Sequence, residues 1–286
     1  MMDRKTENPM EGKWIPATSV RSGAGEEVVS DVYSLTVQIV NVSFVGDPES
    51  KQGWVLVDAG MPGSADDILS TAADRFGGRK PTAIILTHGH FDHVGAVVYL
   101  AKKWNVPVYT HPREMPYLTG RSRYPEPDAT VEGGWVAKIS PLFPTEPVDL
   151  GGYVKELPED GRVPGMEGWR WLHTPGHTPG HISLYRKRDR SLLAGDAFVT
   201  VRQDSVYQVM TQAPEVNGPP RYLTTDWQAA RESVRKLASL EPAAVVTGHG
   251  RPMAGEELSR GLEQLARDFD RVAVPDYGRY VDRIEH

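Results

Sequence analysis

The hydrophobic residues of this chain occur in short runs separated by polar or Gly/Pro-rich segments. Runs rich in Val, Ile and aromatic residues are typical of buried strands. The first covers residues 32–45, where alternation of apolar and polar positions from Tyr33 to Ile39 predicts a half-buried strand. Further runs predict strands at 54–57, 82–86, 106–109, 169–172, 181–185, 191–194 and 243–246.

Helices are indicated between these runs by start and stop signals. Ser64 is a candidate N-cap with two aspartates in the turn that follows, and Gly77-Gly78 ends this helix after Phe76. Apolar residues at helical spacing predict further helices at 94–104, 226–240 and 256–269, and shorter helical patches around 113–118 and 135–139.

The strands fall into two clusters separated by a segment of different character. Residues 111–165 hold nine of the chain's 23 prolines, and loops this long inside a compact domain are usually functional. Two clusters of strands with helices favour two stacked sheets flanked by helices, an α/β (α+β) layout. We expect a loosely ordered lead-in at 1–30 and a single domain at 31–286. The Pro-rich segment is then an insertion, and 256–286 forms a C-terminal helix and tail.

Composition narrows the function. The chain has no cysteine, which excludes disulfides, thiolate zinc sites, iron–sulfur clusters and a cysteine nucleophile. With 32 Lys+Arg against 38 Asp+Glu the net charge is −6, which disfavours a nucleic-acid binder with a large basic face. The first 27 residues contain no apolar segment typical of a secretory signal, and no apolar run approaches the ~20 residues of a membrane span. We therefore expect a cytoplasmic protein with no membrane partner.

A dense group of histidines follows the buried run at 82–86. His88, His90 and His93 fall within six residues, with Asp92 among them, although the whole chain has only nine histidines. Imidazoles and carboxylates that leave a tight turn from one side can converge on a metal ion. The alternative, a polar turn with surface histidines, gives no reason for a buried run to end in polar residues.

Three further motifs place a histidine or aspartate at a strand end. One Thr-Pro-Gly turn precedes His177, and a second precedes His181 at the start of a predicted hairpin. Asp196 and His249 each follow an apolar run. Each motif alone is an ordinary polar strand end, but together they predict one site on a shared sheet edge.

In this order, the motifs resemble those of the metallo-β-lactamase-fold superfamily. The resemblance spans roughly residues 30–252, and Asp58, which ends its strand, matches the family's early aspartate. It implies a four-layer αββα sandwich of two mixed β-sheets flanked by helices, with one or two metals at the sheet edges. The motifs that carry it are Thr87-His88-x-His90-x-Asp92-His93, Thr174-Pro175-Gly176-His177, Gly195-Asp196 and Gly248-His249-Gly250.

The resemblance also implies a ligand set for two divalent metal ions. The first would be held by three histidines, the second by two histidines and an aspartate, and one aspartate would bridge both. Residue by residue, these are His88, His90 and His177, then Asp92, His93 and His249, with Asp196 as the bridge.

Two residues near these ligands are expected to support them. Asp58 more readily orients the ligand turn than binds metal, because carboxylates behind imidazoles fix their tautomers. His181 departs from the family, since many relatives have serine there, and we expect it behind the ligands or facing the substrate.

These ligands permit metal-assisted hydrolysis. Two dications ~3.5–4 Å apart can bridge a water and lower its pKa toward ~7, which supplies a hydroxide nucleophile at neutral pH. Asp92, which we expect to be catalytic, is placed to guide the proton as well as to bind metal. A nitrogen and oxygen donor set suits Zn²⁺, our expectation for this binuclear centre, but also Fe or Mn.

The substrate is less defined by the sequence. Within the superfamily the chain is similar to the glyoxalase II and lactonase-like branch, and we expect hydrolysis of a small ester, thioester or lactone. Ala197-Phe198-Val199 stands where acyl-homoserine-lactone lactonases carry a tyrosine, and only about 35 residues follow His249, where glyoxalase II relatives have a helical domain. Aromatic residues of the insertion, Tyr117, Tyr124 and Trp135, are candidates to line a substrate pocket or, alternatively, a dimer surface.

Two other functions stay open at this point. A mononuclear-iron persulfide dioxygenase would use similar ligands for oxidation instead of hydrolysis. A metal-holding binding module without catalysis is the third hypothesis, which the complete ligand set disfavours.

Overall fold

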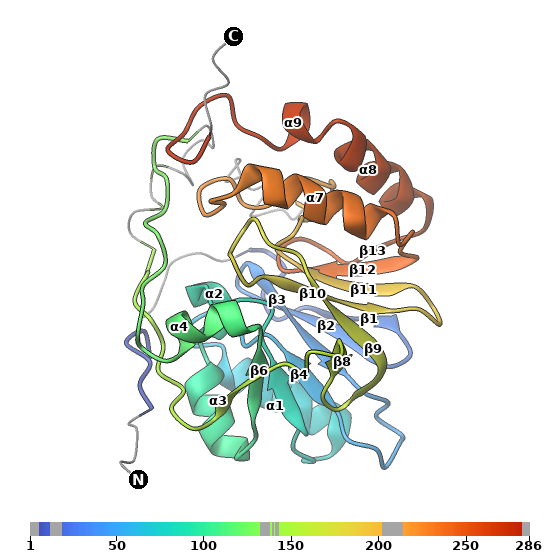
Figure 1. Ribbon diagram of the computed structural model, residues 1–286. Helices are drawn as coiled ribbons and strands as arrows, with labels where there is room; N and C mark the ends of the chain where they lie inside the picture. Colours follow the sequence, from blue (N-terminus) through green and yellow to red (C-terminus); the bar gives the residue numbers. More distant parts are fainter. Residues whose placement is uncertain are drawn as a thin grey trace. The chain divides into compact units, whose positions relative to one another are not determined.

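The structure, a computed structural model, describes residues 6–11, 19–131, 138, 140, 143–201 and 214–281 (Figure 1). The chain forms two mixed sheets, of seven and six strands, together with helices. Its internal contacts divide it into two compact units. The first unit comprises Met1–Tyr124 and Thr145–Trp171, and the second comprises Pro125–Pro144 and Leu172–His286.

The sheet of the first unit has its strands in sequence order. Strands β1 to β4 pair antiparallel, whereas β4 to β7 run parallel to one another. The parallel strands therefore send their carboxyl ends to the same edge, where loops that follow them can meet. The strands are β1 (Gly25–Val29), β2 (Val32–Val37), β3 (Val40–Val45), β4 (Val55–Val57), β5 (Ala83–Ile85), β6 (Val108–Thr110) and β7 (Val154–Glu156).

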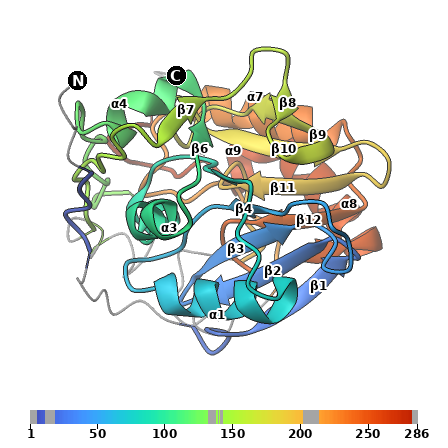
Figure 2. The ribbon, with the colours of Figure 1, turned by 90° about the horizontal axis from the view of Figure 1, so that it is seen from below.

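Helices pack beside this sheet, as Figure 2 shows for α1 and α3. Helix α1 buries Ile68, Ala72 and Phe76, and the Phe76 ring stacks on Trp54 with centroids 4.5 Å apart. The helices of the first unit are α1 (Ala65–Phe76), α2 (Phe91–Val94), α3 (Val97–Trp104), η1 (Pro112–Glu114) and α4 (Met115–Leu118). The hairpin of β8 (Arg162–Val163) and β9 (Met166–His173) belongs to this unit except for the last two residues of β9.

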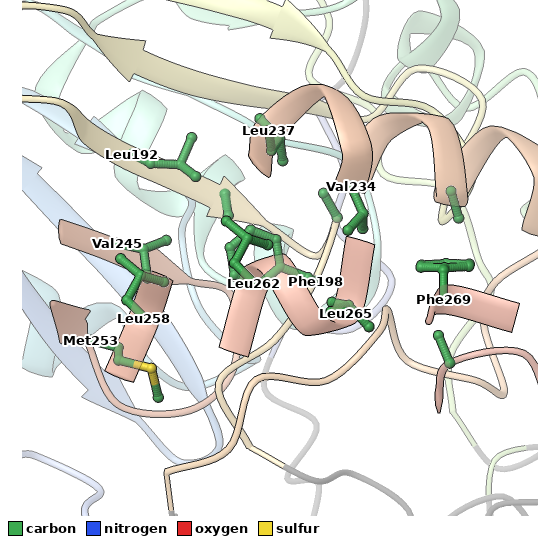
Figure 3. Packing of buried hydrophobic residues seen from close by; sticks show 14 of the residues in the cluster. Leu192, Phe198, Val234, Leu237, Val245, Met253, Leu258, Leu262, Leu265 and Phe269 are labelled. Atoms are coloured by element: carbon green, nitrogen blue, oxygen red, sulfur yellow. The ribbon is translucent and has the colours of Figure 1, made fainter. Parts of the chain in front are cut away.

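The second unit has a core between its sheet and two helices (Figure 3). Side chains of β11 and β12, such as Leu192 and Val245, pack in one cluster with Val234 of α7 and Leu262 of α8. In the sheet, β11 pairs antiparallel with β10 and parallel with β12. The elements are β10 (Ile182–Arg186), β11 (Ser191–Gly195), α7 (Trp227–Ala238), β12 (Ala244–Thr247), β13 (Met253–Ala254), α8 (Gly255–Arg267) and α9 (Phe269–Val272).

The structure corrects two sequence expectations, one for a strand and one for a helix. The half-buried strand expected from Tyr33 to Ile39 is instead a hairpin of β2 and β3, because Gln38 adopts a left-handed conformation (φ 58°) that turns the chain. Five of the six β2 residues are buried. The alternation of apolar and polar residues in this segment therefore does not correspond to alternating burial and exposure. Within the segment expected as a lead-in, Asn8 donates from Nδ2 to the Gly95 carbonyl (2.7 Å), and β1 begins at Gly25. The lead-in itself stays a prediction.

The helix expected at 94–104 is divided into α2 and α3. The Gly95 amide donates to the Gly60 carbonyl (2.7 Å) and the Ala96 amide to Ala59 (3.1 Å), so these amides bond outside the helix. A Cβ at Gly95 would lie 2.1 Å from the Met61 carbonyl carbon, which requires glycine there. The single domain expected at 31–286 stays a prediction. Among the described residues, no helix has the length and apolar character to cross a membrane.

Candidate metal centre

The ligand turn of the first unit begins where β5 ends. Thr87 follows the buried strand, and both of its polar groups bond to Asp58, which follows the neighbouring parallel strand β4. The Thr87 amide donates to Asp58 Oδ1 and its hydroxyl to Asp58 Oδ2, each at 2.8 Å. Asp58 reaches this position in a left-handed conformation (φ 62°). The two strand ends are thus joined at the sheet edge that carries the histidines.

Asp58 also fixes the orientation of two imidazoles. Its Oδ2 lies 2.9 Å from Nδ1 of His93. Because the Thr87 hydroxyl gives its proton to Asp58, its oxygen can accept from Nδ1–H of His88 at 3.1 Å. With Nδ1 protonated in both rings, Nε2 carries the lone pair, which is the arrangement of a metal-binding histidine. Asp58 has the contacts expected of a residue that orients this turn.

The four predicted ligands of the first unit are buried together. The rings of His88 and His90 have centroids 4.8 Å apart, and those of His88 and His93 4.2 Å apart. A potential ligand atom of His88 lies within 4.8 Å of a potential ligand atom of His90 and of one of His93. The same distance limit holds between Asp92 and His93. The surface-turn alternative is excluded because all four side chains are buried. The exposed fractions are 0% for His88 and His93, 4% for Asp92 and 6% for His90.

The sequence reasoning missed one residue beside this turn, Glu114, and assigned another, Tyr124, to a substrate pocket. The Gly89 amide donates to Glu114 Oε2 (3.1 Å) and to the Tyr124 hydroxyl oxygen (2.9 Å). Burial raises the pKa of Tyr124 well above its ordinary value, and the neighbouring Glu114 raises it further. Tyr117 stacks on Tyr124 with centroids 3.8 Å apart, whereas Trp135 lies outside the described residues.

The predicted ligands of the second unit converge on one carboxylate. Asp196 directly follows β11, and His249 follows β12, which runs parallel to β11. Nε2 of His177 and Nε2 of His249 each lie 3.4 Å from Oδ2 of Asp196. All three side chains are buried. Two imidazoles that share one carboxylate oxygen fit a site in which that carboxylate binds metal with both of them.

His181 supports this carboxylate from behind. Its Nε2 accepts from the Asp196 amide at 2.9 Å, so the proton of the neutral ring is on Nδ1. Nδ1 lies 3.0 Å from the Thr174 carbonyl and 2.9 Å from the Thr174 hydroxyl. Both ring nitrogens therefore bond within the second unit, and the side chain is fully buried. Both expectations for His181, support of the ligands or substrate contact, stay predictions, and these contacts agree with the first.

A threonine that the sequence did not indicate supports His177. Thr224 lies between β11 and β12 in the sequence. It is fully buried, and its hydroxyl donates to the Pro220 carbonyl at 2.8 Å. Its oxygen lies 3.2 Å from Nδ1 of His177 and accepts from that nitrogen. His177 thus has the same tautomer as His88 and His93, with Nε2 bearing the lone pair. No local spacing could have identified Thr224, which is 47 residues from its partner.

The donor set fits divalent metal ions. Three of the five predicted histidine ligands have Nδ1 held by an oxygen, so each presents Nε2. The other predicted donors are His90, His249 and the carboxylates of Asp92 and Asp196. Imidazole with carboxylate suits Zn²⁺, Fe and Mn, and the absence of cysteine excludes a thiolate ligand.

Comparison with known proteins identifies the family. The sequence model of the metallo-beta-lactamase superfamily matches residues 35–249. The chain is 52% identical over 264 residues to the probable metallo-hydrolase YflN of Bacillus subtilis, covering 92% of this chain and 100% of that protein. It is 24% identical over 175 residues to the hydroxyacylglutathione hydrolase GloC of Haemophilus influenzae, covering 58% of this chain and 70% of that protein.

Solved structures share the fold. A crystal structure of TTHA1623 in a di-iron-bound form has a TM-score of 0.52 and 29% identity, covering 80% of this chain and 92% of that one. BJP-1, a subclass B3 metallo-β-lactamase of Bradyrhizobium japonicum, has a TM-score of 0.56 and 21% identity, covering 89% of this chain and 94% of that one. The predicted fold class of two mixed sheets with helices is confirmed. The chain is a metallo-hydrolase and belongs to the metallo-β-lactamase superfamily.

Proposed function

We propose that this metallo-hydrolase uses two divalent metal ions, held by the histidine and aspartate ligands predicted from the sequence. The observation that carries the proposal is the set of buried imidazoles whose Nδ1 atoms are fixed by Asp58, Thr87 and Thr224. Such fixing directs Nε2 to a metal. The family match covers residues 35–249 and with them all of these ligands, which supports the proposal.

In this proposal every ligand binds metal, and Asp92 has a second role. His88, His90 and His177 would hold the first ion, Asp92, His93 and His249 would hold the second, and Asp196 would bind both. When bound, the ions lower the pKa of water toward ~7 and polarise the bond to be hydrolysed. Asp92 lies in the first turn of α2 and would receive the proton that the attacking water loses.

We further propose zinc as the metal and a small ester, thioester or lactone as the substrate. The name of GloC, a hydroxyacylglutathione hydrolase, supports an acyl compound as substrate. The di-iron form of TTHA1623 makes iron the competing metal. Tyr117 stays a candidate for substrate contact, since its ring is only half-buried.

Metal quantification on protein purified without chelator tests the proposal. We expect between one and two equivalents of zinc, and hydrolysis of members of a panel of thioesters, lactones and aryl esters. The double variant His88→Ala/His90→Ala should lose the metal, whereas His173→Ala, a half-buried histidine that bonds to the Pro179 carbonyl, should keep it.

Two results would overturn the proposal. One is wild-type protein with no bound metal and no change in melting temperature when metal is added. The other is one equivalent of iron together with oxygen consumption on glutathione persulfide, which would replace hydrolysis by persulfide oxidation.

A further inference from the structure

Gly89 separates the ligands His88 and His90, and its amide is held by a segment far away in the sequence. It donates to Glu114 Oε2 at 3.1 Å and to the Tyr124 hydroxyl oxygen at 2.9 Å. The Tyr124 hydroxyl in turn donates to the same Glu114 oxygen. One buried carboxylate and one buried phenol therefore close around a single peptide group between two ligands.

The fold brings Glu114 to this place through the strand next to β5. Strand β6 runs parallel to β5, so the residues after each strand meet at the same sheet edge. The short helix η1 starts there with His111 as its cap, whose Nδ1 accepts from the Arg113 amide at 3.1 Å. Glu114 ends this helix with an exposed fraction of 0%, and a carboxyl buried so completely needs donors such as Gly89 and Tyr124.

The Tyr124 ring packs against one ring of the ligand turn and one ring of α4. Its ring lies 4.4 Å from the His90 ring, centroid to centroid, and its other neighbour is the Tyr117 ring at 3.8 Å. Only 8% of Tyr124 is exposed. A Cβ at Gly89 would lie 2.7 Å from the Tyr124 hydroxyl oxygen, so only glycine lets the phenol reach the peptide. The position of Tyr124 therefore requires a glycine between His88 and His90.

We propose that Glu114 and Tyr124 are positioning residues for the metal centre. By fixing the Gly89 peptide, they set the directions in which His88 and His90 present their imidazoles, and the Tyr124 ring limits rotation of His90. The proposal rests on the proposed function in one respect, namely that these histidines bind metal. It assigns Tyr124 a place behind the ligands instead of the substrate contact that the sequence suggested.

The test uses Tyr124→Phe, which removes only the hydroxyl, and the pair Glu114→Gln and Glu114→Leu. Gln keeps an oxygen that can accept from Gly89, whereas Leu does not. The matched control is Tyr185→Phe, which removes a phenol that donates to the Leu240 carbonyl (3.1 Å) in the second unit. The readouts are zinc affinity by competition with a chromophoric chelator, the absorption spectrum of the Co²⁺-substituted protein, and the melting temperature without metal.

Tyr124→Phe and Glu114→Leu are expected to weaken zinc binding by about 10–100-fold, the range for groups that orient metal ligands. Both should also change the Co²⁺ spectrum, and Glu114→Gln should recover part of the affinity. Tyr185→Phe should leave the zinc affinity and the Co²⁺ spectrum unchanged, even if its melting temperature falls as much as that of Tyr124→Phe or Glu114→Leu. This separates positioning from a merely structural role.

The outcomes distinguish this proposal from the proposed function. Wild-type protein that binds metal, with variants that match it in affinity and spectrum, overturns the positioning role alone. Wild-type protein that binds no metal overturns both. Metal binding without hydrolysis of any substrate in the panel refutes only the hydrolytic part, because affinity and spectrum still report on Glu114 and Tyr124. If Tyr124→Phe fails to fold, Glu114→Gln against Glu114→Leu decides.

Discussion

The two units of the molecule hold their proposed metal ligands by different means. In the first unit the ligands fall within the six residues from His88 to His93, and acidic groups support them. Asp58 bonds to His93 directly and to His88 through Thr87. In the second unit the ligands span residues 177–249, and neutral groups support them: the Thr224 hydroxyl and the imidazole of His181.

This difference predicts unequal sensitivity to substitution. Hydrogen bonds to an ionised group are roughly twice as strong as neutral ones, and a carboxylate behind an imidazole raises its basicity as a ligand. A hydroxyl fixes the ring without adding charge. Loss of a supporting group should therefore cost more metal affinity in the first unit than in the second, although each group is equally buried.

Asp58→Asn should have the largest effect. It keeps the shape of the side chain but removes the charge that orients His88 and His93, and an amide cannot accept from Thr87 and His93 with the same geometry. We expect zinc affinity to fall by about 10–100-fold, measured by chelator competition. The rate of hydrolysis should fall with it at limiting metal and recover partly at excess metal.

The control for Asp58→Asn is Asp189→Asn, which removes a carboxylate from an ion pair in the second unit. Burial raises the Asp189 pKa, but hydrogen bonds from Arg186 and Ser191 outweigh this and lower the pKa to about 2. Its stabilisation is therefore present above the ordinary pKa of 3.8 and is lost as pH falls toward 2. We expect a loss of about 1–2 kcal/mol in unfolding free energy at neutral pH, with unchanged metal affinity. If Asp58→Asn and Asp189→Asn bind zinc with equal affinity, the Asp58 carboxylate does not support metal binding. The distinction between the two units is then lost.

The proposed ligands have local signals in the sequence. His88 lies three residues after β5 in the first unit and Asp196 directly after β11 in the second, each at the carboxyl end of a strand in its own sheet. The N-cap Asp226 is similar, since its side chain accepts from the Ala229 amide (2.9 Å) only three residues on. Spacing along the chain determines such contacts.

The supporting groups could not be predicted because their contacts are long-range. Glu114 bonds to Gly89 across 25 residues, and Thr224 bonds to His177 across 47. Neither residue belongs to a motif, so only the fold identifies it. The hairpin between β2 and β3 was missed for a different reason: Gln38 adopts a left-handed turn conformation for which glutamine gives no sequence signal.

His181→Phe should have an intermediate effect, on stability more than on metal. Phenylalanine keeps the ring volume but removes the acceptor of the Asp196 amide and the donor to the Thr174 carbonyl. Each buried group left without its hydrogen bond costs about 1–3 kcal/mol. Urea unfolding of the metal-free protein should show this loss. His173→Phe, at a half-buried position, is the control and should stay within about 0.5 kcal/mol of wild type.

If His181→Phe unfolds at the wild-type urea concentration, the hydrogen bond from the Asp196 amide does not stabilise this strand end. The neutral support of the second unit would then lie with Thr224 alone. The contrast with the first unit would then be sharper. One hydroxyl would support the ligands of the second unit, whereas the Asp58 carboxylate orients two histidines in the first.

Thr224→Val should have the smallest effect of the three. Valine has nearly the shape of threonine but cannot accept from Nδ1 of His177, so the ring loses its fixed tautomer without losing a charge. We expect zinc affinity to fall by less than about 10-fold, below the 10–100-fold range of orienting groups, because no charge is lost. Thr224→Ser keeps the hydroxyl and should bind as wild type does. A loss from Thr224→Val as large as that from Asp58→Asn would mean that tautomer, and not charge, governs how these imidazoles bind metal, and the two units would then be equivalent.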